Sequence, residues 1–133
     1  MVSMPNDVRA FLGKANLAVL ATIGPKGRPQ VTPVWFMLED DHILINTSMG
    51  RVKLRNMEAD PRVTLAIVDR DNPYQYVQIR GTVARIDRVN GPRDIDRLSR
   101  RYRGKPYTYP GSDAPENRVS ILIRPVRVAS NLR

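Results

Sequence analysis

Short apolar segments, each bounded by turn residues, constrain the fold of this chain more than any other feature of its sequence. Residues 17–23 form an apolar run that ends at Gly24-Pro25-Lys26-Gly27, and residues 62–68 alternate apolar side chains with polar or small ones. Such segments are typical of half-buried strands joined by turns. Others lie at residues 28–38, 43–45, 74–86 and 119–128. The pattern predicts a mainly β (α+β) protein with six or so antiparallel strands.

Prolines and a glycine give two of these segments special positions. Pro29 and Pro33 have no amide hydrogen to give to a neighbouring strand, so the segment 28–38 should lie on an edge of the sheet or contain a bulge. Its backbone groups would then be free to face a ligand. Gly81 lies within the segment 74–86, where it predicts a bend or a bulge.

Three short helices are expected between the strands, at residues 5–14, at the element that begins over residues 47–55, and at about residues 92–102. The first should cap the sheet, and Asp60-Pro61 ends the second. With six or so strands, these helices predict a small closed or half-closed barrel. At 133 residues the chain is most simply a single domain spanning residues 1–133.

Residue usage excludes several classes of function. The chain has no cysteine and one histidine, His42, at an expected junction of turn and strand. Disulfides, thiolate metal sites and a catalytic thiol are therefore excluded, and we expect no metal site. No apolar run approaches the ~20 residues of a membrane span. The N-terminus has no secretory pattern, so we expect a cytoplasmic protein.

The strongest local signal is a basic stretch that follows residues 46–50. Asn46, Thr47, Ser48 and Gly50 can cap or open a helix, and three cations follow within about one turn: Arg51, Lys53 and Arg55. Unpaired amides at a helix start favour a phosphate, and cationic side chains add charge-assisted hydrogen bonds. A net charge of +9 also indicates an anionic partner, although not which one. The alternative is a solvated helix with a basic outer face.

Residues 104–117 form the longest segment without an expected helix or strand. They contain three prolines, two glycines and two tyrosines. A loop of this length in a compact domain is more often a lid or a binding loop than a plain connection. Tyr107 and Tyr109 are therefore weak candidates for a catalytic proton donor, with packing or surface positions as the alternative.

The order of motifs resembles the split β-barrel flavin and deazaflavin oxidoreductases, the pyridoxamine 5′-phosphate oxidase-like superfamily. More narrowly, it is similar to the branch that uses the deazaflavin coenzyme F420. The resemblance covers nearly the full length. It rests on four segments: Leu17-Ala18-Val19-Leu20-Ala21-Thr22-Ile23, Gly27-Arg28-Pro29-Gln30-Val31-Thr32-Pro33-Val34-Trp35-Phe36, Arg51-Val52-Lys53-Leu54-Arg55-Asn56 and Asp60-Pro61-Arg62-Val63.

This resemblance implies an antiparallel split barrel of six to seven strands with short capping helices, paired in a homodimer with cofactor at the interface. By position it implies that Arg51 and Lys53 hold the cofactor phosphate, with Arg55 less certain. Thr47 and Ser48 would contact the phosphate or the ring. Residues along the ring edge would be Gln30, Val31, Thr32, Pro33 and Val34. Trp35 would wall the pocket or belong to the core, and Gln78 and Tyr76 would come from the partner subunit or be ordinary strand residues.

The implied activity is hydride transfer between F420 and an unsaturated acceptor such as a quinone, enone or tetrapyrrole. F420 carries glutamate carboxylates beyond its phosphodiester, and further arginines are available to meet them: Arg28, Arg55, Arg97, Arg100 and Arg101. The chain has Ile123-Arg124-Pro125-Val126-Arg127 where the pyridoxamine phosphate oxidases proper have a substrate motif, and we do not expect their long N-terminal extension. We therefore do not expect vitamin B6 oxidation.

Three alternatives stay open. The first is an FMN-dependent oxidase or reductase on the same fold. The second is a non-catalytic protein that binds F420 or FMN. The third is a basic β-barrel that binds nucleic acid, which would need stacking aromatics on a strand face. Aromatic residues are only 6% of the chain, and Tyr74 and Tyr76 are one pair at strand spacing, so we expect no nucleic acid partner.

Overall fold

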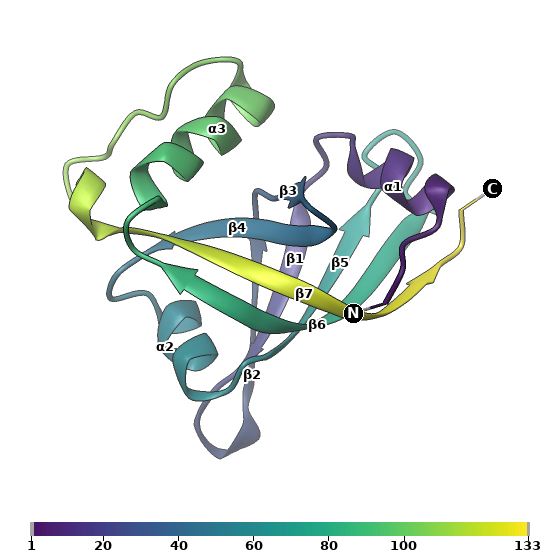
Figure 1. The fold of residues 1–133 in the computed structure, drawn as a ribbon, viewed down its shortest axis with the longest axis horizontal. Helices are drawn as coiled ribbons and strands as arrows, with labels where there is room; N and C mark the ends of the chain where they lie inside the picture. The colour runs from purple at the N-terminus through teal and green to yellow at the C-terminus, as the bar shows by residue number, and fades with distance from the viewer. Residues whose placement is uncertain (1, 133) are drawn as a thin grey trace.

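The fold is a curled antiparallel sheet of seven strands, described here for residues 2–132 of a computed structural model (Figure 1). The strand order is β2-β1-β5-β6-β7-β4-β3. The edge strands β2 and β3 do not pair with each other within these residues, so the sheet is not closed. The bounds are β1 Ala18–Ile23, β2 Pro29–Val34, β3 Met37–Glu39, β4 His42–Ser48, β5 Arg62–Val68, β6 Tyr76–Asp87 and β7 Arg118–Ser130. The expected mainly β, split-barrel class is confirmed.

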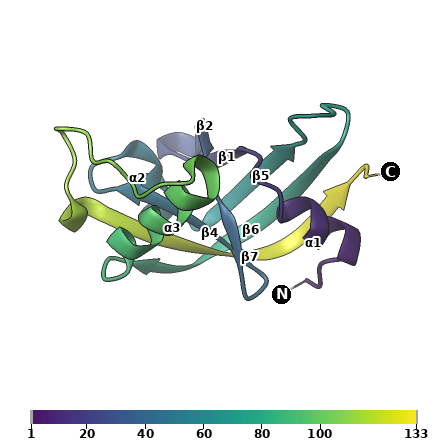
Figure 2. The same ribbon diagram turned by 90° about the horizontal axis from the view of Figure 1, so that it is seen from above.

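Three helices lie at the two ends of the sheet. The helices are α1 Asn6–Leu12, α2 Val52–Ala59 and α3 Gly91–Arg103. In both ribbon views, α2 and α3 lie at one end and α1 at the other (Figures 1 and 2). Two 3-10 turns, Pro25–Gly27 and Pro115–Asn117, complete the chain. No helix within residues 2–132 has the length and apolar character that crossing a bilayer requires.

Alternation along the strands builds the core on the inner face of the sheet. Leu20 of β1 pairs with Leu65 of β5, which pairs with Ile79 of β6, and all three are fully buried. Phe11 and Leu12 of α1 close the core at one end, and Leu54 and Met57 of α2 at the other. Neighbouring positions on the same strands face outward, and no helix of residues 2–132 covers this opposite face of the sheet (Figures 1 and 2).

The structure confirms both expectations that rested on backbone chemistry. β2, which contains Pro29 and Pro33, is an edge strand. The β6–β7 register shifts between Arg80 and Gly81, which is a bulge at the expected place. A Cβ at Gly81 would lie 2.6 Å from the side chain of Ile123, so the close approach of β7 requires glycine there.

Two local predictions were wrong. The expected strand 28–38 is broken at Trp35 and Phe36, because the backbone of Phe36 bonds to side chains of α3 instead of continuing the ladder. The residues expected to cap the second helix, Asn46, Thr47 and Ser48, instead belong to β4. Arg51 precedes the first turn of α2, and among the residues that the structure describes no side chain caps that helix.

Candidate functional site

A cleft of about 330 Å³ opens where the end of β2, strand β4 and the starts of α2 and β7 meet beneath α3. Its wall contains Leu17, Pro33, Val34, Trp35, Asn46, Thr47, Ser48, Arg51, Lys53, Ile95, Leu98, Tyr107 and Arg118. A second hollow of about 300 Å³ continues from it under the 104–117 loop and shares Ser48, Arg51 and Tyr107. One region therefore joins polar hydroxyls and cations to an apolar and aromatic surface.

Two cations at the start of α2 have no carboxylate partner in the part of the chain that the structure describes: Arg51 and Lys53. Arg51 is exposed and Lys53 is half-buried. Burial, followed by the charges of Arg51 and Arg118, lowers the pKa of Lys53 below its usual 10.5. An anion placed here would relieve the repulsion among these cations, so the cleft is suited to a phosphate or a carboxylate.

Arg118 is a third cation of the cleft, which sequence analysis missed. The residue is only 7% exposed. Its Nε donates to Oδ1 of Asn46 at 2.9 Å, and its Nη1 donates to Oγ of Ser48 at 2.7 Å and to Oδ2 of Asp113 at 3.0 Å. Because Ser48 and Asp113 are 70 and 5 residues away from Arg118, no local pattern links them. The sequence signal that could have pointed to Arg118 is its place as a cation directly before the last apolar segment, residues 119–128.

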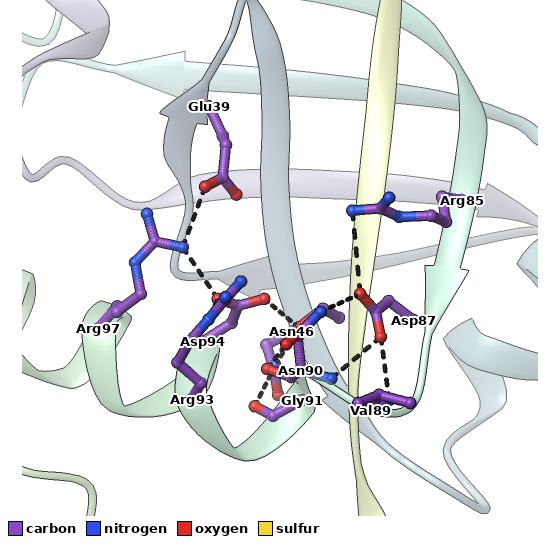
Figure 3. Close-up of polar contacts among 11 residues, drawn as sticks. Glu39, Asn46, Arg85, Asp87, Val89, Asn90, Gly91, Arg93, Asp94 and Arg97 are labelled. Carbon is purple, nitrogen blue, oxygen red and sulfur yellow. Dashed lines mark hydrogen bonds and ion pairs between the residues drawn. The ribbon is translucent and has the colours of Figure 1, made fainter.

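The floor of the cleft rests on a buried polar network between β4, β7 and α3. Nδ2 of Asn46 donates to the carbonyl of Gly91 at 3.0 Å and to Oγ of Ser120 at 3.2 Å. Ser120 in turn donates to Oδ2 of Asp94 at 2.7 Å. Figure 3 shows Asp94 between Arg97 and the Asn46 side chain. This network fixes the Asn46 amide, on which the guanidinium of Arg118 depends.

Gly91 allows α3 to approach this network closely. A Cβ at position 91 would lie 2.0 Å from the carbonyl oxygen of Arg118. Real Cβ atoms essentially never approach another heavy atom so closely, and the backbone oxygen of Arg118 cannot turn away as a flexible side chain could. The start of α3 is therefore held against the start of β7, directly beside the cleft.

Aromatic rings form the opposite wall. The ring of Trp35 stacks on that of Tyr102, and Tyr107 meets Trp35 edge-on with ring centroids 6.5 Å apart. Tyr109 packs edge-on against Tyr107 at 4.8 Å and does not line the cleft. Burial raises the pKa of the Tyr109 phenol. Of the two candidate proton donors, Tyr107 is therefore the one at the cleft surface.

The 104–117 loop is fastened to the body of the protein at both ends. The amide of Tyr107 donates to Oδ1 of Asp96 at 2.9 Å, and Oγ of Ser99 donates to the carbonyl of Lys105 at 2.8 Å. Toward its other end, Asp113 accepts from Ser48 and Arg118. These bonds hold the loop as a wall of the cleft.

The structure brings together part of the set that the sequence suggested. Thr47, Ser48, Arg51, Lys53, Pro33, Val34, Trp35 and Tyr107 line the cleft. Six others do not line it in the single chain: Gln30, Val31, Thr32, Arg55, Gln78 and Tyr76. Arg55 borders a separate hollow beside the Pro25–Gly27 turn, and Gln78 lies on the outer face of β6 beside Arg80 and Arg127. Their roles as cofactor contacts stay predictions.

The arginines of α3 are already engaged elsewhere. Arg97 pairs with Asp94 and Glu39, and Arg100 pairs with Asp96. Arg101 donates to four backbone carbonyls, those of Leu12, Gly13, Lys14 and Phe36. Arg97 therefore fastens α3 to β3, and Arg101 fastens it to Phe36 and to the end of α1, whereas the pair of Arg100 lies within α3. Arg28 and Arg55 stay available for a longer anionic tail.

Comparison with known proteins gives relatives over almost the whole chain. Residues 4–131 match the family model described as pyridoxamine 5′-phosphate oxidase. A solved structure titled F420 reductase is 32% identical with a TM-score of 0.84, covering 95% of this chain and 98% of that one. A conserved hypothetical protein from Mycobacterium tuberculosis is 28% identical, with a TM-score of 0.73 and coverage of 98% and 85%.

A more distant structure shows the same fold alone. HupZ from Group A Streptococcus is 20% identical, with a TM-score of 0.69 and coverage of 96% of this chain and 94% of that one. The chain belongs to the pyridoxamine 5′-phosphate oxidase family of split-barrel proteins.

Proposed function

We propose that this protein is an F420-dependent reductase that passes a hydride from the reduced coenzyme to an unsaturated small molecule such as a quinone, enone or tetrapyrrole. The observation that carries the proposal is one cleft in which Arg51 and Lys53, two cations without carboxylate partners within residues 2–132, lie beside an aromatic wall. The likeness to a structure titled F420 reductase supports the choice of coenzyme.

The residues of the cleft fit a flat ring with a phosphate at one end. Arg51, Lys53 and the hydroxyl of Thr47 supply donors for the phosphate, and Ser48, whose hydroxyl donates to Asp113, lines the same part of the cleft. Leu17, Val34, Trp35, Ile95 and Leu98 supply an apolar surface for the ring. Arg28 and Arg55 lie toward the Pro25–Gly27 turn, where they can meet glutamate carboxylates beyond the phosphate.

The protein contributes orientation and exclusion of water. When bound, reduced F420 supplies the hydride, and a proton from a donor of the site or from water completes the two-electron reduction of the acceptor. Trp35 and Tyr107 bound the space in which the acceptor would lie, and the fastened 104–117 loop shields it. The phenol of Tyr107 is the side chain proposed to hold that proton.

We further propose that the protein acts as a homodimer. On the outer face of the sheet, Val19 pairs with Ala66, which pairs with Gln78, and no other element of residues 2–132 covers this face. Exposed apolar side chains gather on β1, β5, β6 and the neighbouring β2: Val19, Val68, Tyr76 and Val31. Such a surface is typical of an interface between subunits. A second copy seated there would bring Gln78 and Tyr76 toward the cofactor.

Parallel titration with F420 and FMN, followed by fluorescence, tests the proposed function. Wild-type protein should bind F420 more tightly than FMN. The double variant Arg51→Ala/Lys53→Ala should lose roughly a hundredfold or more in affinity, because each charge-assisted hydrogen bond contributes about 1.5–3 kcal/mol. Glu58→Ala, an exposed change on the same helix outside the cleft, is the control. Preference for FMN would assign the protein to flavin chemistry, and binding of neither would refute the proposal.

A further inference from the structure

Arg118 is a cation buried in the wall of the cleft, and its guanidinium is fixed on two sides. Nε donates to Asn46, while Nη1 donates to Ser48 and Asp113. Asn46 is itself held by the carbonyl of Gly91 and by Ser120. The ring of Tyr107 lies 5.3 Å from the guanidinium carbon. The side chain therefore has one position, which is set by three elements and the loop.

One end of this guanidinium has no partner. Residues 2–132 offer no hydrogen-bond acceptor to Nη2, whereas Nε and Nη1 are both bonded. Nη2 is not one of the fully buried polar atoms without a partner within residues 2–132, so it keeps accessible surface from which a charged donor can bond to an acceptor on a ligand. Because Arg118 lines the cleft, that ligand would lie in the cleft itself.

The charges around Arg118 leave room for an anion. Asp113 balances one positive charge, but its Oδ1 already accepts from Ser48 and from the amide of Ala114, and its Oδ2 from Arg118. The charges of Arg51 and Lys53 have no such balance. Lys53 is close enough to Arg118 for the two cations to repel each other, which is one cause of the lowered pKa of Lys53. A single anionic group can therefore lie between Lys53 and Arg118 and contact both.

We propose that Arg118 is a cofactor-binding residue whose Nη2 donates to the same phosphate that Arg51 and Lys53 hold. This inference rests on the proposed function and adds a fixed ligand from β7 to the two flexible cations of α2. Arg118 would set the position of the phosphate, since Arg51 and Lys53 can move while Arg118 cannot. The hydroxyl of Ser48, held by Arg118, would then be placed beside the same group.

A pair of ligands that differ only by the phosphate, FMN and riboflavin, tests this proposal. Binding of both is compared on wild type, Arg118→Met, Arg118→Lys and the control Arg124→Met, and F420 is compared in the same way with its ribityl deazaflavin core, which lacks the phosphodiester together with the glutamate tail. Arg124 is an exposed residue of the same strand, far from the cleft. Arg118→Met should lower the affinity for the phosphate-bearing ligand by roughly ten- to a hundredfold and the affinity for the phosphate-free ligand by less than about threefold. Arg124→Met should change neither.

Two results would overturn the role of Arg118. The first is an equal loss for both members of a pair, which would show that Arg118 only supports the fold. The second is no loss at all. Melting temperatures are measured alongside, and if Arg118→Met fails to fold, Arg118→Lys decides the question. Lysine keeps the charge but cannot bond to Asn46, Ser48, Asp113 and a ligand together. Arg118→Lys should therefore also lose affinity selectively for the phosphate-bearing ligand, but less than Arg118→Met does.

Failure of the proposed function gives a different pattern. If wild type binds neither cofactor, the proposed function falls, and the melting temperature in inorganic phosphate then tests Arg118 by itself. Stabilisation by phosphate in wild type and in Arg124→Met, but not in the Arg118 variants, would retain the anion site. Equal response of all four proteins would remove it.

Discussion

The indole of Trp35 lies stacked against the phenol ring of Tyr102, with ring centroids 5.4 Å apart and the ring planes 10° apart. The hydroxyl of Tyr102 also accepts from the amide of Phe36 and donates to the carbonyl of Asn16 at 2.6 Å. The last turn of α3 therefore holds the break between β2 and β3 in place. That break turns Trp35 toward the cleft.

Removing the hydroxyl of Tyr102 should destabilise this junction. Tyr102→Phe keeps the stacked ring but leaves the amide of Phe36 and the carbonyl of Asn16 without their partner. We expect the free energy of unfolding to fall by about 1–3 kcal/mol, measured by urea denaturation. Tyr74→Phe, at an exposed position, should be neutral. An unchanged midpoint for Tyr102→Phe would show that the junction is held in another way.

The lowered pKa of Lys53 makes a prediction about pH. Because the folded chain binds this proton less tightly than the unfolded chain, the free energy of unfolding should rise with pH between the lowered pKa and the usual 10.5. A bound phosphate favours the charged lysine, so affinity for FMN or F420 should fall as pH rises through the lowered pKa.

Lys53→Arg is the matched variant for this experiment, because arginine keeps its charge throughout the range. The ratio of its affinity to that of wild type, taken at each pH, cancels the titration of the ligand. We expect this ratio to grow toward alkaline pH, and the growth should begin at a pH below that at which a lysine with the usual pKa of 10.5 loses its proton. A constant ratio would mean that Lys53 does not contact the anion.

The two loop tyrosines should differ in their effect on turnover. Tyr107 lines the cleft, whereas Tyr109 packs against the ring of Tyr107 and does not line the cleft. Tyr107→Phe should slow hydride transfer by roughly a hundredfold, a typical loss for a general acid, and Tyr109→Phe by much less. Single-turnover rates with reduced F420 measure this. Unchanged rates in the variant with both substitutions would remove the tyrosines from the mechanism and leave water as the proton source.

Placing a charge on the outer face of the sheet should separate the subunits. Ala66 lies in the middle of that face, opposite Val19 and Gln78. Ala66→Arg should give a folded monomer by light scattering, with weakened cofactor binding because Gln78 and Tyr76 no longer approach the cleft. Val89→Arg changes an exposed apolar residue outside the sheet and should leave the dimer intact. A dimer that persists in Ala66→Arg would contradict this interface.

Sequence reasoning found what local chemistry determines. The edge position of β2 follows from Pro29 and Pro33, and the bulge in β6 from Gly81. Arg51 and Lys53 could be singled out because they follow one another at the start of a helix. In each case the prediction follows from the chemistry of one residue type, or of two residues that lie close together in the sequence.

Long-range contacts could not be foreseen in this way. The break at Phe36 depends on Arg101 and Tyr102, and the position of Arg118 depends on Asn46 and Ser48. Side chains of one strand choose partners from another only after the sheet order is known. The single domain over residues 1–133 and the contributions of a second subunit stay predictions for the same reason.

Oxidation of reduced F420 by a panel of quinones, enones and tetrapyrroles tests the central claim most directly. We expect wild-type protein to restore the absorbance of the oxidised coenzyme with at least one acceptor, in equal amounts of coenzyme oxidised and acceptor reduced. The Arg51→Ala/Lys53→Ala variant should not. Turnover with FMN and not with F420, or tight binding of F420 without turnover on any acceptor, would contradict the account.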